Sequence, residues 1–247
     1  MRRALPVLLP LAAVFVLALW RSEGPPPRDA NAPANAFSAI RAKNTLRAVL
    51  MDGVPHPVGT RANMRVRSRI QTQFRALGYD VTLQRRFACN AAAMCAVVEN
   101  VIATPPGNAQ GDIVLLTAHY DSVGAGGGAS DDGMGIAALL EIARAIRNEQ
   151  FRNRVMFLID DGEEAGLLGA EAFAADEARM RDVAAIINIE MRGTHGASNM
   201  FETSRGNRWL IRHLASSVER PMATSLFYTI YNLLPNDTDV TVFKRAG

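Results

Sequence analysis

Three apolar stretches of the chain, residues 112–118, 154–160 and 184–190, end in or lead into side chains that bind cations or move protons. These side chains are His119, Asp121, Asp160, Asp161, Glu163, Glu164 and Glu190. In open α/β sheets, ligands bind beyond the carboxyl ends of the strands. Carboxylates gathered there would repel one another unless a positive charge lay among them. One imidazole with several carboxylates suits zinc or a related divalent ion better than calcium or magnesium.

A glycine-rich run at 126–133, "GGGASDDG", adds two adjacent carboxylates, Asp131 and Asp132, directly before an apolar helical pattern. Glycines ahead of a helix can cradle a phosphate, but two carboxylates would repel it. Either Asp could instead cap the helix, with its carboxylate facing the helix dipole. Binding a cation is the third possibility, and the carboxylates at the other strand ends favour it.

Taken singly, the other residues have simpler explanations. Glu163 and Glu164 could be solvated loop charges, and His119 could be a hydrogen-bonded core histidine. The metal site is favoured because all of these groups follow strands of one predicted sheet.

The elements that must position these residues alternate between strands and helices. Strands are predicted at 79–87, 96–103, 112–118, 154–160, 184–190 and 198–203, and helices at 37–50, 63–77, 133–147, 167–180 and 206–218. The strand–helix–strand order predicts an α/β fold with a mainly parallel central sheet flanked by helices.

The first 21 residues have the pattern of a membrane segment. Two Arg residues precede sixteen uncharged, mainly apolar residues from Leu5 to Trp20. This length fits a short anchor or the core of a signal peptide. No small-x-small cleavage site follows closely, which favours an uncleaved anchor over a cleaved signal or a buried helix. The positive charge before the segment predicts a cytoplasmic N-terminus, with the rest in the periplasm or lumen, or secreted if the segment is cleaved.

Residues 22–35 are rich in Pro and Ala and predict a flexible linker, so that residues 36–247 form the main domain. Cys89 and Cys95 enclose five residues and could close a small disulfide loop in an oxidising compartment, or remain two thiols. The net charge is only +3, and the Arg residues form no dense basic block with interleaved aromatic residues. We therefore expect no nucleic-acid binding.

Several motifs resemble a known family. "AHYDS", "GASDDGMG", "DGEEAGLLGA" and "NIE" occur in the order and spacing of the co-catalytic di-zinc aminopeptidases. Within that superfamily the chain is similar to the endoplasmic-reticulum metallopeptidase (Fxna-like) branch, also in "PHPVGTRAN", "CAVVENVIA", "MFETSRGN" and "NDTDVTVF". The resemblance covers about residues 36–247 and implies a zinc-exopeptidase-like sandwich of the phosphorylase/hydrolase type.

The resemblance also implies a set of metal ligands. Asp131 would bridge two zinc ions. His119 and Glu190 would complete the protein ligands of one zinc, and Glu164 would bind the other.

Two further residues take roles in the reaction by the same resemblance. Glu163 would be the general base, and Asp121 would accept the free imidazole N–H of His119 and fix its tautomer. Asp132 would be a neighbour of the bridging ligand. Two zinc ions would share a water, lower its pKa and polarise the scissile carbonyl.

The family's last ligand, a His near the end of the domain, has no counterpart before the chain stops at Gly247. His195 and His213 are the remaining candidates. His195 follows Glu190 but matches no ligand position of the family, and His213 lies in a predicted helix, where a surface position is expected. His56, between two prolines, predicts an ordered turn. We therefore expect a C-terminally truncated domain that binds one metal firmly and a second weakly, with impaired activity. Two tightly held zinc ions per chain would contradict this expectation.

The leading expectation is a membrane-anchored zinc exopeptidase, most simply an aminopeptidase, acting on peptide or protein substrates. Two alternatives stay open. One is a glutaminyl-cyclase-like acyltransferase, which uses a related fold. The other is a non-catalytic ectodomain that binds proteins, although such domains usually lose metal ligands. The motifs do not decide between aminopeptidase and carboxypeptidase, nor the substrate side chain.

Overall fold

The computed structural model describes residues 5–107, 110–191, 193, 196–234 and 236–246. Its contacts divide the chain into two compact units. The larger unit comprises Pro27–Arg192 and Asp237–Gly247, and the smaller comprises Met1–Pro26 and Gly193–Asn236.

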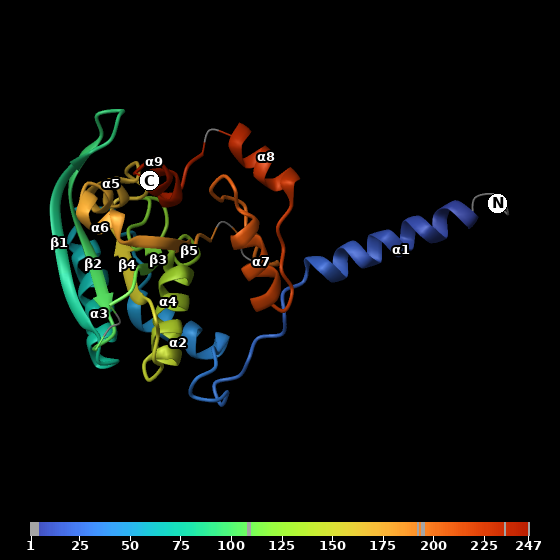
Figure 1. The fold of residues 1–247 in the computed structure, drawn as a ribbon, viewed down its shortest axis with the longest axis horizontal. Helices are drawn as coiled ribbons and strands as arrows, with labels where there is room; N and C mark the ends of the chain where they lie inside the picture. The colour runs from blue at the N-terminus through green and yellow to red at the C-terminus, as the bar shows by residue number, and fades with distance from the viewer. Residues whose placement is uncertain (1–4, 108–109, 192, 194–195, 235, 247) are drawn as a thin grey trace. The chain divides into compact units, whose positions relative to one another are not determined.

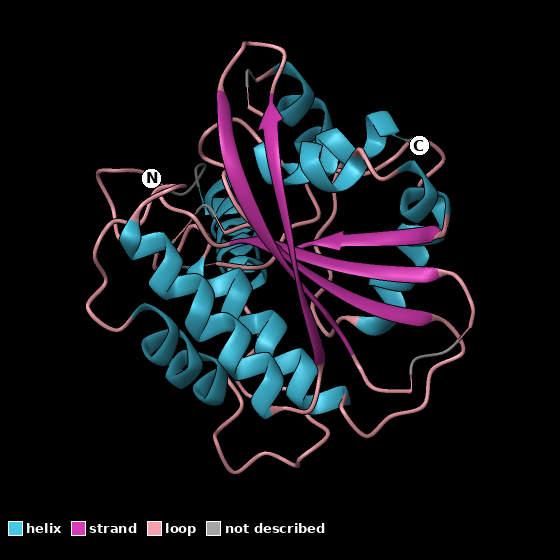
Figure 2. Cartoon of the chain, turned by 90° about the vertical axis from the view of Figure 1, so that its left-hand side faces the viewer, coloured by secondary structure: helices cyan, strands magenta, loops and turns pink. Residues whose placement is uncertain are grey.

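The larger unit is built on a twisted five-stranded sheet (Figures 1 and 2). The strands are β1 (Asp80–Cys89), β2 (Cys95–Thr104), β3 (Ile113–His119), β4 (Arg154–Asp160) and β5 (Val183–Asn188), in the order β1-β2-β4-β3-β5. β3 is parallel to both β4 and β5, whereas β2 is antiparallel to β1 and β4. The α/β class is confirmed, and the two antiparallel strands make the sheet mixed.

The register brings the predicted strand ends to one edge of this sheet. His119 at the end of β3 pairs with Asp160 at the end of β4. Thr117 pairs with Asn188, and its carbonyl accepts the amide of Ile189 at 2.9 Å. Glu190 therefore follows directly beyond β5, next to the end of β3.

Helices cover both faces of the sheet (Figure 2). One face carries α2 (Ala39–Leu50), α3 (Arg61–Ala76) and α4 (Gly133–Ile146), and the other carries α5 (Leu168–Ala174) and α9 (Asp239–Ala246). A hydrophobic core lies on each face of the sheet, and successive residues of β4 contribute to different cores. Phe157 packs with α3 and α4 on one face, and Leu158 packs with α5 and α9 on the other. This alternation is why the buried strands are apolar on both faces.

The helix predicted at 167–180 is two helices, α5 and the short α6 (Glu177–Arg181). The break lies at Ala175, which ends α5. Asp176 then caps α6, because its side chain accepts the amide of Arg179. An N-cap residue has non-helical backbone angles, so the chain turns between the two helices.

A buried ion cluster ties the segment before α2 to the helices. Glu141 of α4 accepts hydrogen bonds from the Ser38 amide at 2.9 Å, Arg41 Nε at 3.0 Å and Arg144 Nε at 2.7 Å. The two guanidinium groups also donate to backbone carbonyls between residues 30 and 36. The carboxylate is 2% exposed, and its charge is matched on two sides.

The smaller unit contains α1 (Leu5–Ser22), α7 (Arg208–Ser217) and α8 (Ser225–Leu233). The strand predicted at 198–203 is wrong: within the described part of the chain this segment makes a single isolated bridge, Asn199 to Met222. A strand needs a continuous partner edge, and one pairing does not supply it. No helix among the described residues is long and apolar enough to cross a membrane.

Candidate metal centre

Three predicted ligands converge at the sheet edge. One ligand atom each of His119, Asp131 and Glu190 lies within 4.8 Å of the other two. They come from the end of β3, the glycine-rich loop before α4 and the segment after β5. Glu164, the fourth predicted ligand, is exposed on the loop after β4 and lies outside this triplet. Imidazole nitrogen and carboxylate oxygen are donors that zinc accepts.

Both ring nitrogens of His119 face carboxylates. Nε2 lies 3.0 Å from Asp131 Oδ1, and Nδ1 lies 3.4 Å from Asp121 Oδ1 and 3.2 Å from the Asp121 carbonyl. The ring is fully buried. Burial alone would lower the pKa of His119, but hydrogen bonds to Asp121 and Asp131 outweigh it and raise the pKa well above its usual value. Because Nδ1 faces Asp121, Nε2 is the ring nitrogen that faces Asp131 in the triplet.

The structure separates the two adjacent Asp residues. Asp132 is buried and caps α4, because its Oδ1 accepts the Gly135 amide at 3.1 Å. Asp131, half-exposed, faces His119 instead. Burial raises the pKa of Asp132 well above its usual value. The charge of His119 lowers this pKa, whereas the charges of Glu190 and Asp131 raise it further. The helix cap, Asp132, and the candidate ligand, Asp131, are thus adjacent residues with different partners.

Close backbone approach explains part of the glycine run. A Cβ on Gly127 would overlap the carbonyl oxygen of Gly53, so the loop before Asp131 lies directly against the loop after α2. His56, on that second loop, is buried. Its amide donates to Ser122 Oγ at 2.8 Å, and its Nδ1 lies 2.9 Å from the Val54 carbonyl oxygen. Hydrogen bonds therefore hold His56 in the loop between α2 and α3.

Asp121 has a second contact that its sequence position did not predict. Its Oδ1 accepts the amide of Glu163 at 3.0 Å, and its Oδ2 accepts the amide of Glu164 at 3.2 Å. One buried carboxylate therefore holds the backbone of the loop after β4 and also faces the His119 ring.

Sequence reasoning missed Asp239, the first residue of α9. It is fully buried, and burial together with the nearby Asp239 charge raises the pKa of Asp160 well above its usual value. Burial also raises the pKa of Glu163 to about 8; His119 opposes this rise, whereas Asp239 and Glu190 add to it. The edge thus gathers more negative charge than the strand ends alone predicted. The motif "NDTDVTVF" held the signal, but its helix begins far along the chain from the other groups.

Asp161 points elsewhere. Its carboxylate accepts Asn63 Nδ2 at 2.9 Å and the Glu99 amide at 3.1 Å, which joins β4 to α3 and β2. Burial and the nearby charge of Asp121 raise the pKa of Asp161 to about 7. Its contacts are structural.

Of the two histidines considered as replacement ligands, only His213 lies in the described part of the chain, and it is not among the converging residues. His195 lies outside the described residues. His213 is exposed on α7 in the smaller unit, with its ring 4.3 Å from that of Trp209.

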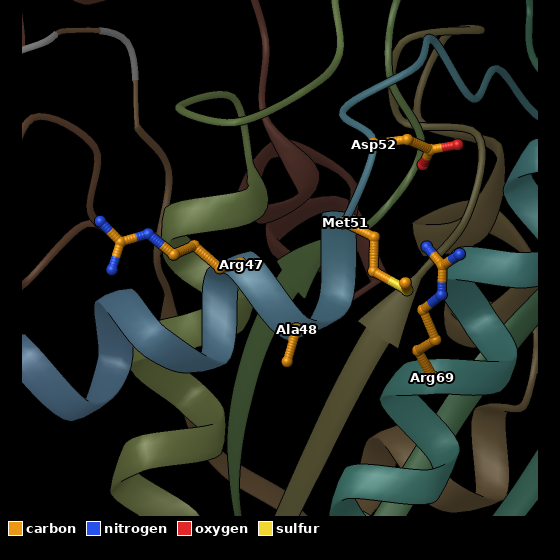
Figure 3. Close-up of a pocket in the computed structure, with 5 residues that line it drawn as sticks. All are labelled: Arg47, Ala48, Met51, Asp52 and Arg69. Carbon is orange, nitrogen blue, oxygen red and sulfur yellow. The ribbon is translucent and has the colours of Figure 1, made fainter.

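A surface depression of about 720 Å³ lies beside the end of α2. It is lined by Arg47, Ala48, Met51, Asp52 and Arg69 (Figure 3). None of these is a candidate metal ligand, and the two Arg side chains extend from different helices, α2 and α3. The depression therefore adds nothing to the candidate centre.

Known sequences provide an independent comparison. Residues 100–247 match Peptidase family M28. A vacuolar membrane protease of Candida albicans (strain WO-1) is 32% identical over 198 residues, which are 78% of this chain and 23% of the relative. Endoplasmic reticulum metallopeptidase 1 of Homo sapiens is 28% identical over 151 residues, 60% of this chain and 17% of the relative. The chain thus spans less than a quarter of the length of these relatives.

Solved structures share the fold. BSAP, a zinc aminopeptidase from Bacillus subtilis, superposes with a TM-score of 0.68 at 17% identity, covering 87% of this chain and 84% of the other. A glutaminyl cyclase from Porphyromonas gingivalis gives 0.69 at 21% identity, covering 85% and 80%. At these identities the likeness shows the fold alone.

Proposed function

Because the chain belongs to Peptidase family M28, we propose that it is a zinc-dependent exopeptidase, most simply an aminopeptidase acting on peptides or proteins. The observation that carries this proposal is the convergence of ligand atoms from His119, Asp131 and Glu190 within 4.8 Å. A family relationship alone would fit a non-catalytic domain as well, but the binding of a protein partner does not require this triplet. The names of the relatives, a protease and a metallopeptidase, support the same class of activity.

The residues fit a zinc ion. The donor set is one imidazole nitrogen and carboxylate oxygens, in a partly buried, strongly acidic surrounding. Burial raises the pKa of Asp132 and of Glu163, the charge of Glu190 adds to both rises, and a divalent cation would relieve this repulsion. His119, Asp131 and Glu190 would hold one ion, and Glu164 would contribute to a second. A bound zinc supplies Lewis acidity and lowers the pKa of a water molecule.

The chain's own residues would do the rest of the chemistry. Asp121 orients His119 through Nδ1 and holds the amides of Glu163 and Glu164. Glu163 is 9% exposed and is the proposed general base. Its carboxylate takes the proton of the attacking water and passes it to the leaving amine nitrogen. Burial favours this role, because a desolvated carboxylate binds a proton more strongly.

The test is Glu163→Gln in zinc-loaded protein, assayed on aminoacyl substrates with a free N-terminus. We expect zinc binding to be retained and turnover to fall by at least about a hundredfold. The matched control is Glu171→Gln, an acidic residue of α5 whose carboxylate pairs with Arg245 instead. Unchanged turnover in Glu163→Gln would remove Glu163 as the base. Loss of ammonia from peptides with N-terminal Gln, without cleavage, would indicate a cyclase.

We infer that the chain works at a membrane, with the α/β unit on the extracytoplasmic side. The matched relatives are named for the vacuolar membrane and the endoplasmic reticulum, and α1 exposes a row of apolar side chains. Fractionation tests this placement. The full chain should pellet with membranes, and protease added on the extracytoplasmic side should degrade the α/β unit. Recovery of the chain in the soluble cytoplasmic fraction would overturn this placement.

A further inference from the structure

The turn between β1 and β2 lies at the same edge of the sheet as the candidate centre. β2 is antiparallel to β4, with Val101 opposite Ile159. The start of β2 at Cys95 therefore extends beyond the carboxyl end of β4, where the loop with Glu163 and Glu164 begins. The hairpin turn in Figure 1 lies at the end of the sheet where α5 begins.

Side chains of this turn contact the loop after β4 directly. Asn90 Nδ2 donates to the carbonyl of Gly166 at 3.2 Å. A Cβ on Gly166 would lie 2.6 Å from Met94 Cε and closer still to Asn90 Nδ2. Gly166 also has φ of +102°, which favours glycine. The turn and the loop are therefore in contact at the backbone of Gly166.

A disulfide and two hydrogen bonds restrain the turn itself. Cys89 and Cys95, directly paired residues of β1 and β2, are joined by a disulfide, which confirms the predicted loop. Asn90 Oδ1 accepts the amides of Ala92 and Met94, both at 3.0 Å. Asn90 thus uses its oxygen to shape the turn and its nitrogen to hold Gly166.

The contacted loop is the one that carries Glu163 and Glu164. The amides of Gly166 and Leu167 both donate to the Glu163 carbonyl at 2.8 Å. On the other side, the amides of Glu163 and Glu164 donate to Asp121. The loop is therefore held between Asp121 and the β1–β2 turn.

We propose that Asn90, on the disulfide-closed turn, is a positioning residue for Glu163 and Glu164. The role in turnover rests on the proposed function, whereas the role in holding the loop does not. Removing the donor at Asn90 releases Gly166, and the turn that starts at Glu163 then opens more often. The disulfide restricts the turn so that Asn90 stays opposite Gly166.

The sharpest variant is Asn90→Asp. The carboxylate still accepts the amides of Ala92 and Met94, but it presents an acceptor to the Gly166 carbonyl. Asn90→Ala removes both functions without adding charge. The matched control is Ala91→Ser, at an exposed position of the same turn. Reduction of Cys89–Cys95 in the folded wild-type protein is a second perturbation that needs no variant to fold, and the chain contains two cysteines only.

Hydrogen exchange of the full chain measures the effect, because the amides of Glu163, Glu164, Gly166 and Leu167 are all hydrogen-bonded. We expect their exchange to rise about fivefold in Asn90→Asp and Asn90→Ala, the factor of one ordinary hydrogen bond, and also on reduction. Amides of β3 and β4 should not change, whereas a general loss of stability would speed them too. On aminoacyl substrates, kcat should fall by about tenfold with KM unchanged.

Unchanged exchange at these four amides in both variants and after reduction would overturn the proposal. So would equal acceleration across β3 and β4. A wild-type protein without turnover, in which Asn90→Asp still speeds exchange at Glu163, would refute the peptidase function but support the positioning role. If the wild-type protein shows turnover, but substitution of Asn90 changes neither exchange nor kcat, the peptidase function would be supported and the positioning role refuted.

Discussion

Asp121→Asn probes the connection between the candidate metal ligand His119 and the loop that carries Glu163, the proposed general base. The Asp121 carboxylate is 1% exposed and has three neighbours: the amides of Glu163 and Glu164, at 3.0 and 3.2 Å, and His119 Nδ1 at 3.4 Å. Asparagine has nearly the same shape but only one acceptor oxygen. Whichever way its amide is turned, an NH₂ group faces at least one N–H donor.

The contacts set the size of the effect. A buried N–H left without its acceptor costs about 1–3 kcal/mol, so the free energy of unfolding should fall by that amount. The weakened contact with His119 Nδ1 acts on the metal instead. Loss of such an outer contact typically lowers metal affinity or activity by about 10–100-fold. Both losses are expected together, because one carboxylate makes both contacts.

The assay combines urea unfolding of the metal-free protein with zinc titration against a competing chelator. The matched control is Asp112→Asn, an exposed residue that precedes β3 at the opposite end of the strand. The control should change neither quantity beyond a few tenths of a kcal/mol.

Unaltered zinc affinity in a destabilised Asp121→Asn protein would show that Asp121 holds the loop but does not orient the ligand. Unaltered stability together with unaltered affinity would refute the reasoning entirely. Asp121→Ala gives an independent reading, since it removes all three contacts and should have at least the effect of Asn.

Three further substitutions test other parts of the site and fold. Asp131→Asn should abolish tight zinc binding, whereas Asp132→Asn should retain it and keep the α4 cap, because Asn caps as well as Asp; equal loss in both titrations would contradict the separation of the pair. Glu141→Gln should cost about 2 kcal/mol of unfolding free energy near neutral pH. Burial alone would raise the pKa of Glu141, but hydrogen bonds from Arg144, the Ser38 amide and Arg41 lower it. The stabilisation by Glu141 is therefore complete above the pKa of the unfolded state, about 4.3, and is lost as the pH falls through the lower pKa of the folded state. The difference between wild type and Glu141→Gln in urea should therefore shrink in acid; a constant difference would contradict it.

Local patterns predicted most of the α/β unit because its central strands, β3 and β4, are buried on both faces. The apolar runs at β3, β4 and β5 leave little doubt about type, and parallel strands bring their carboxyl ends to one edge. His119 and Glu190 were found by that rule alone.

The errors arose where partners far along the chain decide the structure. The predicted strand at 198–203 has suitable residues but lacks a partner edge, and the helix predicted at 167–180 divides at Ala175. Asp239 was missed because no strand end precedes it. The contact between Asn90 and Gly166 spans 76 residues, and no periodicity in either segment indicates it.

The central claim is that zinc binds among His119, Asp131 and Glu190. Anomalous diffraction at the zinc edge from metal-loaded crystals tests it most directly. We predict an anomalous peak about 2.0–2.2 Å from His119 Nε2 and from carboxylate oxygens of Asp131 and Glu190. Zinc held by other residues, with these three side chains outside its coordination sphere, would contradict the account.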